Sequence, residues 1–417
     1  MIKKTVLPNG VRIITEHMPE SYSATVMAWI DAGSFLESSK ISGISHFIEH
    51  LLFKGTKTRS AQKIVQEIED TGSCINAFTE KEFTCYYAKT FSDKTSIILD
   101  ILLDMVFNST FREEDIKLEK QVILEEIKMY EDTPDELVHD MLIKSFWPDN
   151  TLSAPITGTA ESVAHISYND IIEFVENFYT PDNIVISIAG KFNEEEVLEQ
   201  IEKTTAHLKS KRKKTLFTIP TVNPDIITTR KDIEQSHICI GMRGLSILNS
   251  DRYASSIIDI SLGGGMTSRL FQEIREKRGL AYSINTFEAL YRPAGIFGVY
   301  AATNHENINE LINIINYEIE KYRTKGISNE EFQRSIVQLK GSLLIGLEST
   351  KFRASRNGRS ELYFNRTFEV EEICNAINRV TYDDITRLSN YIFDAEYSSL
   401  SIVSPKKYTP LKLSLSC

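Results

Sequence analysis

The sequence predicts an α+β protein made of two homologous domains, each a mixed sheet packed with helices. Residues 166–171 (ISYNDI) are echoed 214 positions later by residues 380–385 (VTYDDI). Each copy then runs through a helical pattern into an apolar strand, at 183–190 and at 397–403. A chain of 417 residues is also long enough for about two or three domains. We therefore expect one unit of helices and strands to be used twice.

The boundary between the two domains is expected at a basic stretch. Residues 208–224 contain the run KSKRKK and two prolines. A run of like charges is most often solvated chain. The prediction is an N-terminal domain over 1–207, a linker over 208–224 and a homologous C-terminal domain over 225–417.

The first domain should begin with two strands, at 11–17 and 23–34, because both stretches are rich in apolar and β-branched residues. A helix follows directly at 43–55, and helical periodicity continues at 60–70. Residues 84–91 (TCYYAKTF) favour a strand by their aromatic and β-branched content. Further helices are expected at 94–107, 113–131, 168–178 and 193–207.

The helix at 43–55 is apolar almost all round, and only three strongly polar side chains interrupt it before its last turn. At about 100° per residue, His46 and His50 fall about 40° apart on one face, and Glu49 lies about 60° to the other side of His46. Two imidazoles so placed can bind one ion, and Glu49 can reach a water molecule beside it. Histidines in an apolar helix are often only satisfied core residues. A bound cation, however, offsets the desolvation cost of three ionisable groups.

A third metal ligand should come from elsewhere, because catalytic zinc usually takes three protein ligands. In the helix at 113–131, Glu119 and Glu126 are seven residues apart and about 20° from eclipsed, with Val122 and Ile123 between them on that face. An ordinary solvated acidic face remains an equally good explanation of these two acids. That explanation fits the other acids of the helix well: Glu113, Glu114, Glu125 and Glu131.

The motif from His46 to His50, followed 76 residues later by Glu126 with Glu119 seven before it, resembles the pitrilysin family of zinc metallopeptidases. The chain length and several sequence segments resemble those of the bacterial relatives of the catalytic subunit of the mitochondrial processing peptidase. The resemblance spans nearly the whole chain. It includes residues 7–10 (LPNG), 76–79 (NAFT), 263–271 (GGGMTSRLF) and 275–282 (REKRGLAY).

The resemblance implies the roles of the site residues. His46, His50 and Glu126 would bind one Zn²⁺ per chain. Glu49 would act as general base, taking a proton from water and handing it to the departing amine. Glu119 would support the zinc ligands without binding the metal itself.

The resemblance also implies substrate contacts. Asn76, Ala77 and Phe78 would form an edge strand that pairs with an extended peptide. Arg275 and Tyr282 match positions that contact substrate from the second domain. An arginine is usually a surface charge and a tyrosine is usually part of the core. The assignment of Arg275 and Tyr282 as substrate contacts therefore depends on the resemblance.

The family shape implied by the resemblance is a clamshell of four such domains. This chain supplies two, half of a clamshell, so a homodimer enclosing a chamber is expected. The implied activity is a zinc-dependent endopeptidase that hydrolyses unfolded peptides or presequence-like basic segments. The alternative is a non-catalytic assembly subunit of the same family, against which the intact ligands argue. The family commonly has a His-Pro-Leu sequence where this chain has residues 151–153 (TLS). This difference changes none of the expected metal ligands.

The composition limits the classes of partner that the chain is expected to bind. A net charge of −11 and a pI near 5.4 argue against nucleic acid and against an anionic membrane surface, and they suit cationic peptides. Five cysteines without CxxC spacing indicate reduced thiols and a cytoplasmic location. The turn at 8–10 (PNG) argues against a targeting segment. The apolar run at 96–107 is too short to span a bilayer.

The second domain should lack the metal-binding and catalytic residues of the first. In the repeat, His46, Glu49 and His50 correspond to Ile257, Ile260 and Ser261. Glu119 and Glu126 meet serines, Ser335 and Ser342. The glycines at 263–265 lack the ending of a phosphate-binding loop and are explained as a helix-capping turn.

Overall fold

The computed structural model describes residues 2–210 and 217–409. The chain forms two compact units. Unit 1 consists of Met1–Lys128, Ala154–Leu216 and Ile345–Glu369, and unit 2 of Met129–Ser153, Phe217–Leu344 and Val370–Cys417.

The units are discontinuous, unlike the contiguous domains expected over 1–207 and 225–417. A helix within residues 129–153, in the first half of the sequence, packs on the sheet of unit 2. A helix within residues 345–369, in the second half, packs on the sheet of unit 1. The compact units therefore differ from the two halves of the sequence. Part of the expected linker over 208–224, including most of its basic run, lies at 211–216, outside the described residues.

Unit 1 is built on a six-stranded mixed sheet of order β1-β2-β6-β3-β5-β4. Strands β2 and β6 are parallel, and the other neighbours are antiparallel. Every residue of β6 is buried, because helices cover both faces of the sheet there. The strands are Ile2–Val6 (β1), Arg12–His17 (β2), Ser23–Ile30 (β3), Cys74–Thr79 (β4), Thr84–Phe91 (β5) and Ile184–Gly190 (β6).

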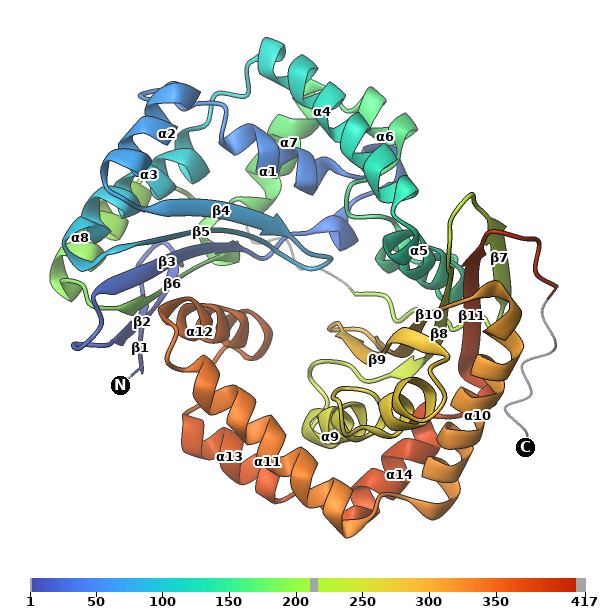
Figure 1. Cartoon of the computed structure of the whole chain (residues 1–417). Helices are drawn as coiled ribbons and strands as arrows, with labels where there is room; N and C mark the ends of the chain where they lie inside the picture. The colour runs from blue at the N-terminus through green and yellow to red at the C-terminus, as the bar shows by residue number, and fades with distance from the viewer. Residues whose placement is uncertain (1, 211–216, 410–417) are drawn as a thin grey trace. The chain divides into compact units, whose positions relative to one another are not determined.

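Several helices pack on one face of this sheet, and α12 lies on the other (Figure 1). The main core includes Val26 of the sheet and Phe47, Leu102 and Phe174 of the helices. The helices are Ile44–Leu52 (α1), Ala61–Asp70 (α2), Thr95–Asn108 (α3), Glu113–Asp132 (α4), Ala160–His165 (α6), Tyr168–Phe178 (α7), Glu194–Thr205 (α8) and Thr350–Phe364 (α12).

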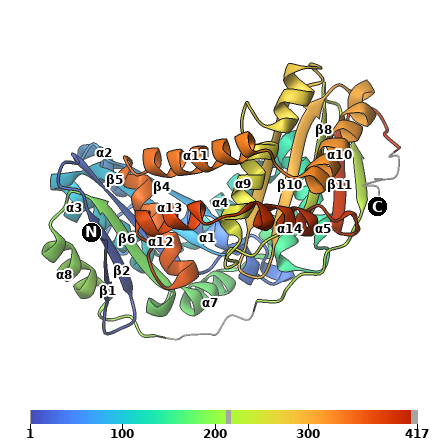
Figure 2. The same ribbon diagram turned by 90° about the horizontal axis from the view of Figure 1, so that it is seen from below.

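Helix α12 runs across strands β2, β3 and β6, although it comes from the second half of the sequence (Figure 2). Its contact with the sheet combines polar pairs with an apolar cluster that includes Ala354 and Leu362. Asn357 donates to Glu16 at 2.7 Å, and Thr350 shares a hydrogen bond with Thr25 at 2.9 Å. Gly358 packs against Trp29, where a Cβ atom would lie 2.2 Å from the indole nitrogen.

Unit 2 repeats this topology. Its sheet has the order β7-β11-β8-β10-β9, which matches β2-β6-β3-β5-β4 of unit 1 strand for strand. Here α5 packs on one face, as α12 does in unit 1. The two-domain α+β fold expected from the repeat is therefore confirmed. The strands are Ile226–Arg230 (β7), Ser236–Gly244 (β8), Ala281–Leu290 (β9), Gly295–Thr303 (β10) and Ser398–Ser404 (β11). The helices are Pro134–Phe146 (α5), Arg252–Leu262 (α9), Ile308–Lys325 (α10), Asn329–Gly346 (α11), Val370–Asn378 (α13) and Tyr382–Ile392 (α14).

Most of the expected elements lie within one or two residues of their predicted ends, and β5 matches 84–91 at both ends. The strand expected over 23–34 was too long: β3 stops at Ile30, and a 3-10 turn forms at Ser34–Leu36. Helices α5 and α12, which exchange between the halves, were not predicted.

Among the described residues, no helix is long and apolar enough to cross a membrane. The four cysteines within the described ranges, Cys74, Cys85, Cys239 and Cys374, are free. Cys417 lies outside those ranges.

Candidate metal centre

Helix α1 begins at a tightly packed point of unit 1. Gly43 precedes it in the left-handed region (φ 93°), and a Cβ there would lie 2.5 Å from the carbonyl oxygen of Thr157. The buried carboxylate of Glu37 accepts the backbone N–H groups of Gly43 (2.6 Å) and Ser45 (2.8 Å). Burial raises the pKa of Glu37 to about 7, although the hydrogen bonds from Ser45 and Gly43 and the charge of Lys81 oppose the shift. Sequence reasoning missed Glu37, whose only signal is an acid shortly before a helix.

The structure brings together His46, His50 and Glu126, here called the metal cluster. His46 Nε2 lies 3.6 Å from one carboxylate oxygen of Glu126, and His50 Nε2 lies 3.5 Å from the other. One ligand atom from each residue lies within 4.8 Å of the other two. Among the residues that the structure describes, no other trio of His, Cys, Asp or Glu side chains meets this criterion. The equivalent helix α9 of unit 2 has Ile257 and Ser261 at the two histidine positions.

The donor set of the metal cluster fits zinc. Two imidazoles and one carboxylate are ligands that catalytic zinc takes, and one ligand atom from each lies within 4.8 Å of the other two. Burial lowers the pKa of His46 to about 4, and the charge of His50 adds to the shift. A neutral imidazole is the form that binds a metal.

Glu119 orients His50. Its Oε2 lies 3.1 Å from His50 Nδ1, and its Oε1 lies 2.6 Å from Lys54 Nζ. Burial would raise the pKa of Glu119, but the hydrogen bonds from His50 and Lys54 outweigh it and lower the pKa. For His50, burial lowers the pKa, but the hydrogen bond to Glu119 and the neighbouring carboxylates raise it overall. With its proton on Nδ1, His50 presents Nε2 to the metal cluster. Sequence reasoning missed Lys54, which stands at the helix end like an ordinary C-terminal cation.

Glu49 lies beside the metal cluster but is not part of it. Its Oε2 accepts a 2.5 Å hydrogen bond from Thr79 Oγ1 at the end of β4. Burial raises the pKa of Glu49, although the hydrogen bond from Thr79 and the charge of His50 oppose the shift. A raised pKa suits a carboxylate that takes up a proton and releases it again. Thr79 was also missed, and only its place three residues after Asn76 could have indicated it.

Asn76, Ala77 and Phe78 lie on β4, the strand at one edge of the sheet of unit 1. They pair with β5 through Tyr87, Tyr86 and Cys85. The Phe78 ring packs edge-on against Trp29, on the face of the sheet that α12 covers. Phe78 can therefore offer a peptide its backbone, whereas its side chain belongs to the core.

Arg275 and Tyr282 meet in unit 2. The guanidinium of Arg275 lies 4.4 Å from the centre of the Tyr282 ring and donates to the Tyr282 carbonyl at 3.1 Å. Arg275 lies in the short helix Phe271–Glu276, and Tyr282 is the second residue of β9 and is 74% exposed. This cation–π contact presents the two side chains together on the surface of unit 2.

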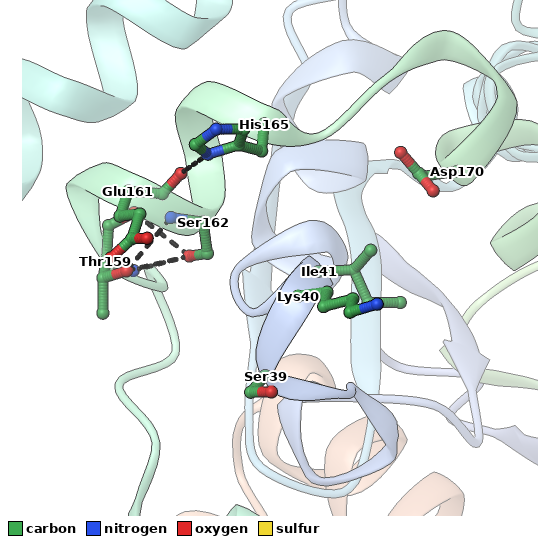
Figure 3. Close-up of a pocket in the computed structure, with 8 residues that line it drawn as sticks. All are labelled: Ser39, Lys40, Ile41, Thr159, Glu161, Ser162, His165 and Asp170. Atoms are coloured by element: carbon green, nitrogen blue, oxygen red, sulfur yellow. Dashed lines mark hydrogen bonds between the residues drawn. The ribbon is translucent and has the colours of Figure 1, made fainter.

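A separate polar pocket of about 590 Å³ lies beside the segment that leads into α1 (Figure 3). Its groups bond mainly within their own helix: His165 Nδ1 is 2.7 Å from the carbonyl oxygen of Glu161, and Thr159 forms a capping box with Ser162. None of the metal cluster lines it, so we assign the chemistry elsewhere. The lining residues are Ser39, Lys40, Ile41, Thr159, Glu161, Ser162, His165 and Asp170.

Known proteins resemble this chain over nearly its whole length. The protein "Uncharacterized zinc protease YmxG" of Bacillus subtilis (strain 168) is 39% identical to this chain over 410 residues, covering 98% of this chain and 100% of the relative. A crystal structure of a protease from Helicobacter pylori has the same fold, with a TM-score of 0.91 and 21% identity, covering 97% of this chain and 99% of that chain. A structure described as the peptidase M16 inactive domain from Pseudomonas fluorescens also reaches 0.91, at 18% identity over 98% of this chain and 100% of that chain.

Two family matches cover successive parts of the chain. Residues 12–160, which include the metal cluster and Glu49, match the insulinase family, peptidase family M16. Residues 165–339 match the domain described as the peptidase M16 inactive domain. The chain belongs to the M16 family of peptidases.

Proposed function

We propose that this chain is a zinc-dependent endopeptidase that hydrolyses unfolded peptides. The observation that carries the proposal is the convergence of His46, His50 and Glu126 beside the carboxylate of Glu49. The relatives named zinc proteases support it.

Each side chain has a separate task in this proposal. Zinc bound by the metal cluster would polarise the scissile carbonyl and acidify a water molecule. Glu49, which Thr79 holds in place, takes the proton from that water and delivers it to the departing amine. Glu119 and Lys54 keep the His50 ring oriented.

The substrate is bound as an added strand at the edge of the sheet. Strand β4 is an edge strand, and its last residue, Thr79, contacts Glu49. An extended peptide pairing with Asn76, Ala77 and Phe78 would therefore run past the general base. Only unfolded segments can pair in this way, because a folded protein has few free extended segments.

Assembly, substrate charge and location belong to the same proposal. A homodimer would enclose a chamber in which Arg275 and Tyr282 of one subunit contact the peptide bound at the metal cluster of the other. The net charge of −11 favours basic, presequence-like peptides. The free cysteines favour the cytoplasm. Stably folded proteins should escape cleavage.

A second candidate is a non-catalytic assembly subunit. It is favoured by the match of residues 165–339 to an inactive domain. That match covers residues 165–339, whereas the metal cluster and Glu49 lie in the first half, so catalysis is the better conclusion.

The test is zinc analysis together with cleavage of unstructured basic peptides. Glu49→Gln should keep zinc and lose activity. Glu126→Gln should lower both, because a neutral amide is a weaker ligand than a carboxylate. A metal-free Glu49→Gln variant, or a Glu126→Gln variant with full zinc and full rate, would overturn these roles. If the wild-type protein holds zinc but cuts no peptide, the assembly role replaces catalysis.

A further inference from the structure

We propose that Leu118 and Val122 of α4 form an apolar wall of the substrate site and give the peptidase a preference for an apolar side chain within two residues of the scissile bond. This inference rests on the proposed peptidase function. Both side chains are largely exposed, Leu118 at 58% and Val122 at 48%.

The positions of these residues follow from the helix. Val122 lies three residues after Glu119 and four before Glu126, so its Cβ is about 5–6 Å from the Cβ of each. Leu118 lies one turn before Val122 on the same side of the helix. The apolar pair therefore adjoins the carboxylate of the metal cluster and the one that orients His50.

The opposite flank of the two carboxylates is different. The isoleucines Ile116, Ile123 and Ile127 are buried there and belong to the core of unit 1. Glu119 and Glu126 thus lie along a line between a buried apolar stripe and an exposed apolar pair. The core does not explain Leu118 and Val122, because other residues supply the core face.

The rest of the exposed face of α4 is mostly charged or polar, with Lys117, Gln121 and Glu125 exposed around the pair. Met129, 58% exposed near the end of α4, is a further apolar residue on the flank of Val122. Scattered exposed apolar residues are ordinary, but two neighbours on one flank of a metal cluster form a patch next to the reacting groups. A ligand that contacts the cluster from solvent would also contact this patch.

The occupant is an extended peptide and not a permanent partner. The side chains of His50 and Glu126 keep 23% and 22% of their surface exposed. A helix docked permanently over the neighbouring patch would cover this access to the cluster. In an extended chain, side chains on one face recur about every 6.6–6.8 Å. Leu118 and Val122 are separated by about 6 Å along the helix axis, so alternate substrate residues can contact both.

The test compares cleavage profiles on a library of unstructured peptides, read by mass spectrometry. The variant Leu118→Ala/Val122→Thr removes apolar contact while keeping residues that a helix tolerates. The matched control is Val337→Thr, an exposed valine (66%) on α11, the counterpart of α4 in unit 2. Zinc content and thermal unfolding are measured for all three proteins to establish that α4 is intact.

The wild type should show enrichment of apolar residues at one position within two residues of the cut. The double variant should lose that enrichment, and its kcat/KM for a peptide with Leu at this position should fall about tenfold. Its kcat/KM for the same peptide with Ser there should be unchanged, and Val337→Thr should behave as wild type. An unchanged profile in the active double variant would overturn this inference alone. Wild-type protein that holds zinc and cuts no peptide would overturn the proposed function and this inference with it.

Discussion

Glu119 lies behind His50, with its Oε2 3.1 Å from His50 Nδ1, while its other oxygen is 2.6 Å from the ammonium of Lys54. The Glu119 side chain is only 4% exposed, and burial alone would favour its neutral form. The hydrogen bonds from His50 and Lys54 stabilise the charged carboxylate. Lysine, glutamate and histidine thus form a chain that ends at the metal cluster. Its effect is to hold the proton on His50 Nδ1 and leave Nε2 free.

Replacing Glu119 should therefore weaken metal binding without removing a ligand. We expect Glu119→Gln to lower zinc affinity about 10–100-fold, measured by competition with a chelator, and Lys54→Met to lower it by less. Saturating zinc should restore part of the activity of both variants. Glu125→Gln is the matched control, because Glu125 is an exposed neighbour on α4 that pairs with Lys128. Unchanged zinc affinity in Glu119→Gln would show that the contact with His50 has no such role.

The chemistry of the first half could be predicted because it depends on local spacing. His46, Glu49 and His50 share one helix, and the pairing of Glu119 with Glu126 follows from helical geometry. The residues alone put forward Glu119 and Glu126 as candidates for the third ligand, beside the explanation of an ordinary acidic face, and only the resemblance selected Glu126. Lys54, Thr79 and Glu37 were missed because each acts through a contact between separate elements. Their types and positions also have ordinary explanations.

The packing of α12 on the sheet of unit 1 could not be predicted, for a physical reason. A helix packed on a sheet usually shows an apolar stripe. Four of the six buried residues of α12 are polar or glycine, namely Thr350, Asn357, Gly358 and Glu361, so Ala354 and Leu362 alone make no clear apolar stripe in the sequence. Their partners, among them Glu16 and Arg12, are more than 300 residues away in the chain.

Gly358 should be essential for the docking of α12. An added Cβ would lie 2.2 Å from the Trp29 indole nitrogen, which is fully buried and donates to Ser187 at 2.9 Å. We expect Gly358→Ala to lower the free energy of unfolding by about 1–3 kcal/mol, measured by denaturant titration, despite the higher helix propensity of Ala. Gly341→Ala in α11 is the control. A Cβ there meets nothing within 4 Å, so this change should be neutral or stabilise by up to about 1 kcal/mol. Equal stabilisation by both changes would contradict the packing argument.

The packing of α5 on the sheet of unit 2 should depend on pH. Burial lowers the pKa of His139 and of His237, and the charge of Asp135 offsets this only in part. His139 Nδ1 contacts Cys239 Sγ at 3.5 Å, and His237 Nδ1 contacts the hydroxyl of Tyr300 at 2.9 Å. The folded state therefore prefers both imidazoles neutral.

This stabilisation should be complete above the unfolded pKa of about 6.5 and should be lost as pH falls towards the lower folded pKa values. We expect the free energy of unfolding of the wild type to fall between pH 7.5 and pH 5. It should fall less steeply in the variant His139→Gln/His237→Gln. The comparison is made at equal zinc, so that the pH dependence of metal binding is common to both proteins. Parallel pH profiles would exclude the two histidines as the cause.

The last prediction concerns assembly, and it starts from the contact of Arg275 with Tyr282 in unit 2. If this pair completes the site of the other subunit, two chains with different defects should restore one another. A Glu49→Gln chain lacks the general base but keeps the pair, and an Arg275→Ala/Tyr282→Phe chain has the reverse defect. In a mixed dimer, one site has both defects and the other has none.

Each variant alone should be weakly active, and exchange of subunits should recover up to roughly a quarter of wild-type activity, because about half of the dimers mix and each mixed dimer has one intact site of two. Different affinity tags on the two chains measure the exchange. The control mixes Glu49→Gln chains with chains that carry all three substitutions, in which no dimer can contain an intact site, so no activity should return. Complete exchange without recovery would mean that Arg275 and Tyr282 act within their own subunit or outside catalysis. A chain that remains monomeric in solution at assay concentration would exclude completion of the site by a second subunit, because an isolated chain has no partner to supply the Arg275–Tyr282 pair.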